Sequence, residues 1–228
     1  MAIKFDGTDD VVNCGSNAVL DNIQAAMTAM AWINIAGFGE NGTGRIFNKA
    51  SGWLFFVNTT NSTIRLISTR ATTNGDWVNA PFGIALNTTY HVAVTYDGSS
   101  TANNAVFYVD GVLSATTVNA FPVGATSDDS AGDLLIGNTP ATDRTFNGWI
   151  EDARVYNRIL TAAEVLTIKN SQGRDNIRNS MIGRWMGQGV EAGTIGNQID
   201  LSGNSNTGVP SNGPVYTAGP SNYLRRSQ

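Results

Sequence analysis

The dipeptide Asp110-Gly111 stands between two short apolar runs, residues 105–109 and 112–116, and this arrangement constrains the fold more than any other feature of the chain. Both central residues of a type I′ turn need a positive φ, which an Asp-Gly pair adopts readily. A two-residue turn of this type joins antiparallel strands. The sequence therefore predicts a β-hairpin at this point and an antiparallel sheet around it.

Other short runs with strand character follow one another along the chain, separated by glycine, asparagine and threonine. Residues 90–97 alternate between apolar and polar positions, as in a strand with one buried face. Residues 27–35 are apolar on both faces, which is typical of a central strand. Residues 53–57 and 63–68 add two more runs. The pattern favours an all-β protein with many turns.

The last quarter of the chain continues in the same way. Short strands and turns are expected at residues 182–187, 200–208 and 214–216, and no linker sets off a second domain. We therefore predict a single domain over residues 1–228, built as an antiparallel sandwich of two sheets with one short helix.

Residues 146–157 form the longest predicted strand, and its apolar pattern changes phase in the middle. Phe146 and Ile150 share one face, whereas Ala153 and Val155 fall on the opposite one. One extra residue in the strand restores both sets to the same side. We predict a β-bulge at Glu151-Asp152.

One helix is predicted after this strand. Thr161 and Glu164 have the spacing of a capping box, in which each side chain accepts a hydrogen bond from the other residue's backbone. The helix is expected to run to about Asn170, with Val165 and Ile168 on one apolar stripe.

Composition excludes several classes of protein. Charged residues make up 14% of the 228 residues and the net charge is −4, so a nucleic-acid-binding surface is not expected. The single cysteine, Cys14, cannot form an internal disulfide and is predicted to be a small core residue. No secretory signal and no apolar stretch of about 20 residues is present, so we expect synthesis in the cytoplasm and no membrane insertion.

Six motifs occur in a characteristic order and together resemble the laminin-G-like, concanavalin A-like jelly-roll domains over roughly the first three quarters of the chain. They are residues 5–12 (FDGTDDVV), 31–33 (AWI), 91–98 (HVAVTYDG), 108–111 (YVDG), 135–138 (LIGN) and 146–157 (FNGWIEDARVYN). The resemblance implies a two-sheet jelly roll, and the helix that begins near Thr161 matches the family's short helix.

The order of the last segment departs from the family. In most members a segment like residues 185–208 precedes the Phe-Asp-Gly motif, whereas here it follows all the others. We interpret this as a circular permutation, in which residues 181–228 supply the family's usual N-terminal strands. The alternative is that the tail begins a truncated second repeat.

The first motif carries three aspartates, Asp6, Asp9 and Asp10, around Gly7. Hard cations such as calcium take carboxylate oxygens. Relatives of this fold often carry a structural calcium where this turn meets the long strand, and the resemblance implies that Asp6 or Asp9 pairs with Asp152 at the predicted bulge. The alternative is a turn at Asp6-Gly7 whose backbone amides the neighbouring aspartates cap. Both interpretations stay open.

The fold implied by the resemblance also hosts glycosidases, which use two carboxylates about 5–10 Å apart. The chain has no acidic run with that spacing: Glu164 belongs to the capping box, and Glu151 and Asp152 are adjacent. His91, the one histidine, has no recognisable serine or cysteine partner and is assigned a structural role. We therefore predict no catalytic residues and no enzyme, with glycoside hydrolase as the least favoured alternative.

Carbohydrate binding is the usual role that the resemblance implies. Binding sites of this kind use aromatic rings with polar neighbours. Trp53, Trp77 and Phe82 lie near predicted loops, whereas Trp32 and Trp149 lie on strands and suit a core equally well. None of the five is assigned to a site.

Two classes of function remain. Residues 219–226 resemble the short basic endings of permuted members in bacteriophage genomes, and the chain begins at its first motif without a signal. By this analogy we predict a non-catalytic virion surface protein, a capsid decoration or tail-associated subunit, that contacts other virion proteins or its own copies and binds surface glycans. The alternative is a soluble, extracellular lectin-like module.

Overall fold

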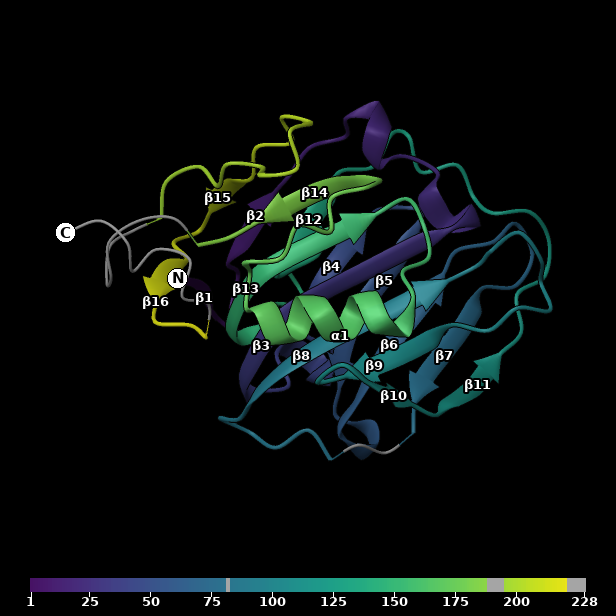
Figure 1. Cartoon of the computed structure of the whole chain (residues 1–228), viewed down its shortest axis with the longest axis horizontal. Coiled ribbons are helices and arrows are strands. Elements are labelled where there is room, and N and C mark those ends of the chain that lie inside the picture. Colours follow the sequence, from purple (N-terminus) through teal and green to yellow (C-terminus); the bar gives the residue numbers. More distant parts are fainter. Residues whose placement is uncertain (81–82, 188–194, 221–228) are drawn as a thin grey trace.

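The computed structural model of the chain describes residues 1–80, 83–187 and 195–220, and it consists of two antiparallel sheets packed face to face (Figure 1). Sheet A contains, in spatial order, β10 (Val112–Ser114), β9 (Val106–Val109), β8 (Thr89–Tyr96), β3 (Met27–Gly37), β13 (Asn147–Tyr156), β1 (Ala2–Asp6) and β16 (Val215–Thr217), while β14 (Met181–Trp185) also pairs with β13.

Sheet B contains, in spatial order, β11 (Thr116–Ala120), β7 (Gly75–Asn79), β6 (Thr63–Ser68), β5 (Trp53–Asn58), β4 (Arg45–Lys49), β12 (Leu134–Ile136), β2 (Val11–Asn13) and β15 (Val209–Ser211). Among the described residues, the connections contain the single-turn 3₁₀ helices η1 (Ala18–Leu20), η2 (Ile23–Ala25), η3 (Glu40–Gly42) and η4 (Thr60–Ser62). The prediction of an all-β sandwich of two antiparallel sheets is confirmed.

The main core lies between the sheets because successive side chains of a strand point to opposite faces. Phe55 and Val57 of β5 point inward from sheet B, and Val92 and Val94 of β8 meet them from sheet A. Each such burial stabilises the fold by roughly 1.5–3 kcal/mol relative to exposure. Cys14 lies in the same core, as predicted.

The predicted hairpin forms between β9 and β10. Val109 and Val112 are paired across it, and Asp110 and Gly111 have φ values of 51° and 78°. Both turn residues therefore adopt the left-handed conformation that a type I′ turn requires.

The predicted bulge lies in β13. Glu151 pairs with Trp32 of β3 and Arg154 pairs with Met30, so β13 has one more residue than β3 between these two pairs. Asp152 lies in this interval and has a φ of 49°. Ile150 before the bulge and Ala153 after it both enter the core. The bulge also divides one edge of β13 between two partners: β1 pairs with residues 147–150 and β14 with residues 153–156.

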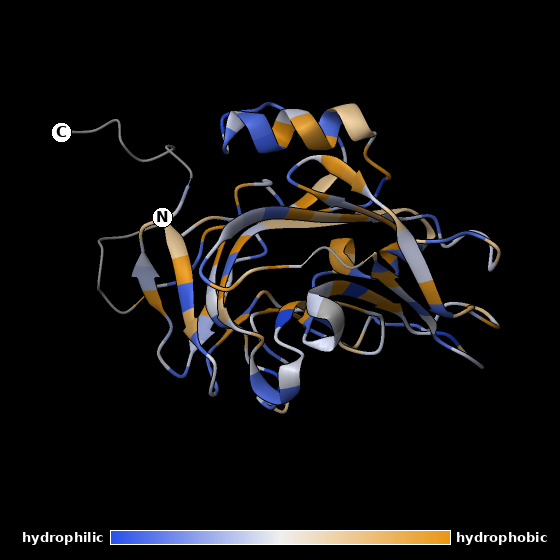
Figure 2. Cartoon of the chain, turned by 90° about the horizontal axis from the view of Figure 1, so that it is seen from below, coloured by the Kyte–Doolittle hydropathy of each residue, from blue (hydrophilic) through white to orange (hydrophobic). Residues whose placement is uncertain are grey.

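The predicted helix is α1 (Ala162–Ser171), and its capping box forms. Thr161 N donates to Glu164 Oε2 at 2.9 Å, and Glu164 N donates to Thr161 Oγ1 at 3.3 Å. Val165 and Ile168 pack on the outer face of sheet A, where they form a second apolar cluster with Tyr156 and its neighbours. The helix is thus a third layer above the sandwich (Figure 2).

The strands after residue 181 join both sheets. β14 pairs with β13 and β16 with β1 in sheet A, while β15 pairs with β2 in sheet B (Figure 1). The backbone after β14 packs closely against the first residue. At Gly187 the two segments are so near that an added Cβ atom would lie 2.2 Å from the Met1 carbonyl oxygen. That relatives carry these strands at the opposite end of the chain stays a prediction.

None of the helices within the residues that the structure describes has the length and apolar character that a membrane crossing requires.

Candidate functional site

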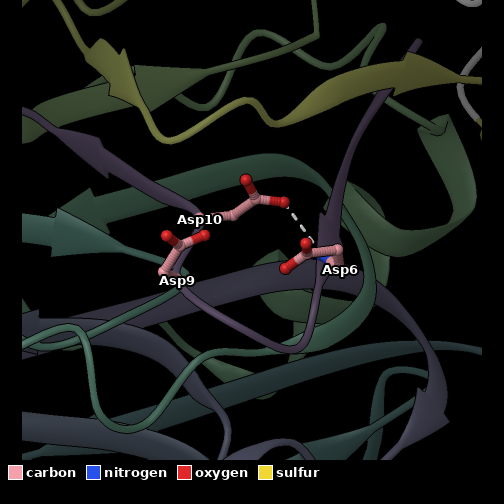
Figure 3. A group of neighbouring side chains, drawn as sticks. All are labelled: Asp6, Asp9 and Asp10. Carbon is pink, nitrogen blue, oxygen red and sulfur yellow. Dashed lines mark hydrogen bonds between the residues drawn. The ribbon is translucent and has the colours of Figure 1, made fainter.

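The three aspartates of the first motif lie together in the turn between β1 and β2 (Figure 3). Asp6, Asp9 and Asp10 each offer a carboxylate oxygen, and these oxygens lie within 4.8 Å of one another. Asp6 is exposed, whereas Asp10 is only 2% exposed. The turn therefore brings one buried and two more accessible carboxylates to one point.

Part of this cluster caps the turn. Asp10 Oδ2 accepts a hydrogen bond from Asp6 N at 2.9 Å, and Asp6 Oδ1 accepts one from Thr8 N at 2.8 Å. The second oxygen of Asp10, Oδ1, is buried without a hydrogen-bond partner among the described residues. Burial, together with the charges of Asp6 and Asp9, raises the pKa of Asp10 to about 6 although the bond from Asp6 N opposes the rise.

The donor set suits a hard cation. Calcium takes six to eight oxygen ligands, among them carboxylates, backbone carbonyls and water. A cation among Asp6, Asp9 and Asp10 would satisfy the unpaired Asp10 Oδ1 atom and remove the repulsion between the three groups. The cluster thus fits the ion that the sequence resemblance implied, with Asp10 in the set.

Asp152 is not brought to this cluster. It is 2% exposed and receives two hydrogen bonds from Arg154, at 3.0 and 2.6 Å, and two from Arg184, at 2.6 and 3.2 Å. Asp175 pairs with Arg154 on its other side. Burial by itself would raise the pKa of Asp152, but the charges of Arg154 and Arg184 outweigh it and lower that pKa to about 2. Both oxygens of Asp152 are therefore occupied by arginines.

The neighbouring carboxylate, Glu151, is also paired. It is 1% exposed, and its Oε1 atom lies 2.8 Å from the α-amino group of Met1. Glu151 and Asp152 thus each face a cation. A glycosidase needs one protonated and one free carboxylate around an open cleft, and this buried pair does not supply them.

The aromatic candidates of the sequence occupy different places. Trp53 and Trp77 are at most 1% exposed and belong to the core, while Trp32 is 5% exposed and packs against the buried His91. Trp149 is half-buried. Phe82 lies outside the described residues. A stacking platform for sugars therefore does not arise from Trp53 or Trp77.

A pocket of about 200 Å³ lies on the outer face of sheet B, over β5, β6, β7 and β11. Polar side chains make up most of its lining, which consists of Asn58, Thr60, Thr63, Arg65, Val78, Asn79, Thr117 and Asn119. This volume is below the roughly 300–1,000 Å³ of pockets for drug-sized ligands. It is therefore large enough for one small polar ring, such as a single unit of a longer ligand.

Charged groups fix one side of this pocket. Arg65 Nε donates to Asp76 Oδ1 at 2.7 Å, Arg65 Nη2 contacts the second oxygen, and Asn119 Nδ2 donates to Asp76 at 3.3 Å. Within the part of the chain that the structure describes, the Thr117 hydroxyl and the Asn58 Nδ2 atom make no hydrogen bond. The pocket thus offers uncommitted donors and acceptors beside a rigid ion pair.

Two larger hollows have a different character. One, of about 510 Å³, lies between η1, η2 and the start of β14, and another, of about 420 Å³, lies beside β2 and β12. In the first, Asn22 and Asn204 already donate to Asp128 and to backbone carbonyls of β14. In the second, Asn13 donates to Asp133. The amides of Asn13, Asn22 and Asn204 are thus already engaged, and we rank both hollows below the pocket on sheet B as sites for a polar ligand.

Sequence reasoning missed two parts of these sites. The sequence assigned Asp10 only to capping, and no local pattern indicates that its side chain is buried beside Asp6 and Asp9. The pocket on sheet B was not foreseen, because its residues are scattered between positions 58 and 119 and meet only through strand pairing.

Comparisons with known proteins agree with this architecture. The model of a family described as the concanavalin A-like lectin/glucanases superfamily matches residues 6–166. A search of curated protein sequences gives no match.

Two solved structures illustrate the likeness of fold. A candidate carbohydrate binding protein from Bacteroides ovatus is similar over 95% of the chain, with a TM-score of 0.69 and 18% identity, and the chain spans 59% of that protein. The binding domain of botulinum neurotoxin serotype D is similar over 72% of the chain and 41% of its own length, with a TM-score of 0.51 and 18% identity.

Proposed function

Because the chain belongs to the concanavalin A-like lectin/glucanase superfamily, we propose that it is a non-catalytic carbohydrate-binding module whose site is the pocket on the outer face of sheet B. One observation carries this proposal: the pocket presents uncommitted hydroxyl and amide groups beside an arginine that is fixed by Asp76. Sugar hydroxyl groups both donate and accept hydrogen bonds, and such groups match them.

The same geometry supports a binding role over hydrolysis. Asp76 lies next to the pocket, and Arg65 neutralises it. Glu151 and Asp152 are buried and paired with cations. Carboxylates in these states are poorly suited to protonate a leaving group or to attack a sugar.

A glycan array followed by calorimetry tests the proposal. We expect the wild type to bind at least one glycan class and Asn119→Ala to weaken that binding, since Asn119 lines the pocket. Asn176→Ala is the matched control, because Asn176 is an exposed asparagine between α1 and β14. An array without hits, or equal weakening by both variants, would refute this site.

We also propose that Asp6, Asp9 and Asp10 hold a structural calcium ion. The unpaired, buried Oδ1 atom of Asp10 carries this second proposal. A ligand that binds only the folded state raises the melting temperature by mass action. We expect calcium to raise the melting temperature of the wild type and of Asp143→Asn, but not of Asp10→Asn. Identical melts of the wild type in calcium and in chelator would exclude the ion.

Finally, we propose that the module is displayed on a virion, where it contacts other virion proteins or copies of itself. Leu113 of β10 and Leu166 of α1 lie on the outer face of sheet A and support an assembly surface there, since their side chains are 64% and 42% exposed. Exposed apolar patches on soluble proteins commonly mark contact sites. Residues 219–226, whose sequence supports the same proposal, lie mostly outside the described residues.

Copurification with intact particles tests this role. We expect the chain to be retained on particles and Leu113→Asp to release it. A monodisperse monomer that binds no particle would instead favour the soluble, extracellular lectin.

A further inference from the structure

Three side chains lie in a row across β4, β5 and β6 on the outer face of sheet B. Arg45 is paired directly with Phe56, and Phe56 with Arg65. The two guanidinium carbon atoms lie 4.4 and 5.6 Å from the centre of the Phe56 ring, and Phe56 is only 2% exposed. The row therefore presents two guanidinium groups over one buried aromatic ring.

The two arginines differ in how their charge is balanced. Arg65 forms its ion pair with Asp76, whereas Arg45 forms no ion pair with any residue that the structure describes. Nη1 of Arg45 donates to the Thr43 carbonyl oxygen at 2.9 Å, and its buried Nε atom has no hydrogen-bond partner among the described residues. Arg45 is nevertheless 9% exposed. It is thus a nearly buried cation that lacks a counter-ion.

The surroundings add to this imbalance. Arg144 lies near Arg45, but its own charge is taken up by Asp143 at 3.1 Å. Burial lowers the pKa of Arg45 to about 10, and repulsion from Arg144 and Arg65 contributes while Asp143 only partly offsets it. An unpaired buried charge is costly, and an anion that arrives from solution removes that cost.

The chemistry of the missing partner follows from the guanidinium group. Its planar fork of N–H donors matches the two oxygens of a carboxylate or sulfate. Arg65 belongs both to this row and to the lining of the pocket described above. Arg45 lies two strands from Arg65, a separation of roughly 10 Å, so a ligand in the pocket that extends along the sheet reaches it.

We propose that Arg45, packed on Phe56 beside Arg65, binds the carboxylate or sulfate group of an acidic glycan that lies across the outer face of sheet B. The inference rests on the proposed carbohydrate-binding function and names its ligand class. Because the chain has a net charge of −4, general attraction to polyanions does not account for such binding. The contact therefore depends on the local arginines rather than on the charge of the whole chain.

Paired ligands of equal backbone test the inference. Calorimetry compares an oligogalacturonate with its methyl ester, and a sulfated galactan oligosaccharide with its desulfated form, while inorganic sulfate serves as the free anion. We expect the wild type to bind at least one acidic member about tenfold more tightly than its neutral partner.

Three variants assign the effect to its residue. Arg45→Met keeps an apolar stem over Phe56 and removes the charge, so it should abolish the preference without lowering the melting temperature. Arg45→Lys keeps the charge without the fork and should retain only part of the preference. Arg178→Gln makes the same change in net charge at an exposed arginine before β14 and should leave the preference intact.

The outcomes separate the inference from the function on which it rests. Equal affinity for acidic and neutral partners would overturn the acidic-ligand inference while the carbohydrate-binding function stands. If no glycan binds, acidic or neutral, both the carbohydrate-binding function and the acidic-ligand inference are overturned. If inorganic sulfate binds but no glycan does, Arg45 is a site for free anions only. A preference that survives in Arg45→Met would also refute the assignment.

Discussion

Two groups of carboxylates that the sequence suggested would act together differ in how the fold treats their charge. Asp152 is buried between Arg154 and Arg184, which make four hydrogen bonds to it. Asp10 is equally buried but has two aspartates beside it, and within the described part of the chain its Oδ1 atom has no hydrogen-bond partner. The first group has its cations within the chain, whereas no cationic side chain pairs with the second among the residues that the structure describes. Arg154 and Arg184 therefore stabilise the buried Asp152 as an anion, whereas burial without such a partner raises the pKa of Asp10.

Removing residues 181–228 tests this comparison most severely. The deletion takes away Arg184 and the strands β14, β15 and β16, so both sheets lose partners and Asp152 loses half of its hydrogen bonds. We expect the truncated chain to lose its cooperative melt in calorimetry. An unchanged, cooperative melt would show that these residues are not part of the fold and would rule out the permutation.

Asp152→Asn should have the next largest effect. The substitution removes the carboxylate that accepts two hydrogen bonds from Arg184 and two from Arg154, while Asp175 still pairs with Arg154. Breaking a buried ion pair costs about 3–5 kcal/mol of unfolding free energy. Urea denaturation measures the loss, and Asp143→Asn, which breaks an exposed pair, should cost only about 0–1 kcal/mol. Equal losses in the two variants would show that the Asp152 network contributes no special stability.

Asp10→Asn should change stability in the opposite direction when chelator is present. The folded-state pKa of Asp10, about 6, lies above its ordinary value of 3.8. The folded protein therefore retains the proton more strongly, and stability falls as pH rises through this interval. At pH 7 the variant should be more stable than the wild type by up to about 3 kcal/mol, and below pH 4 the gain should vanish. A gain that does not depend on pH would mean that the charge of Asp10 is not its cause.

His91 should give the smallest of these effects. Burial, with a contribution from the nearby Arg154, lowers the pKa of His91 to about 3. Below pH 6.5 the unfolded chain takes up a proton that the folded chain does not, so stability falls as pH falls. The loss between pH 6.5 and 5 is about 2 kcal/mol. In urea denaturation, the unfolding free energy of His91→Phe should fall by about 2 kcal/mol less than that of the wild type between pH 6.5 and 5. Identical pH profiles of the two proteins would contradict this.

Local patterns in the sequence predicted the parts of the fold that depend on neighbouring residues. The Asp110-Gly111 turn, the bulge at Glu151-Asp152 and the capping box of Thr161 with Glu164 were all predicted correctly. Each follows from dihedral preferences or from the alternation of side chains within about ten residues. The order of the motifs also indicated the superfamily, which the match over residues 6–166 shows.

The candidate sites were predicted less well because they depend on which distant residues meet. The sequence indicated Asp6 and Asp9 but joined them to Asp152, which the fold instead surrounds with Arg154 and Arg184. Nothing near Asp152 in the sequence indicates Arg184, which lies 32 residues further along. Trp53 and Trp77, which the sequence placed near loops, are buried in the core.

The sequence by itself thus determined the strands, their turns and the class of fold, since alternation and turn chemistry are local properties of the chain. Only the tertiary structure decided which charges have partners. Arg45, Phe56 and Arg65 become a row through the register of three strands. The same register gives Arg65 the carboxylate of Asp76, whereas Arg45 has no ion pair in the part of the chain that the structure describes. Register depends on the packing of whole sheets, and no short stretch of sequence encodes it.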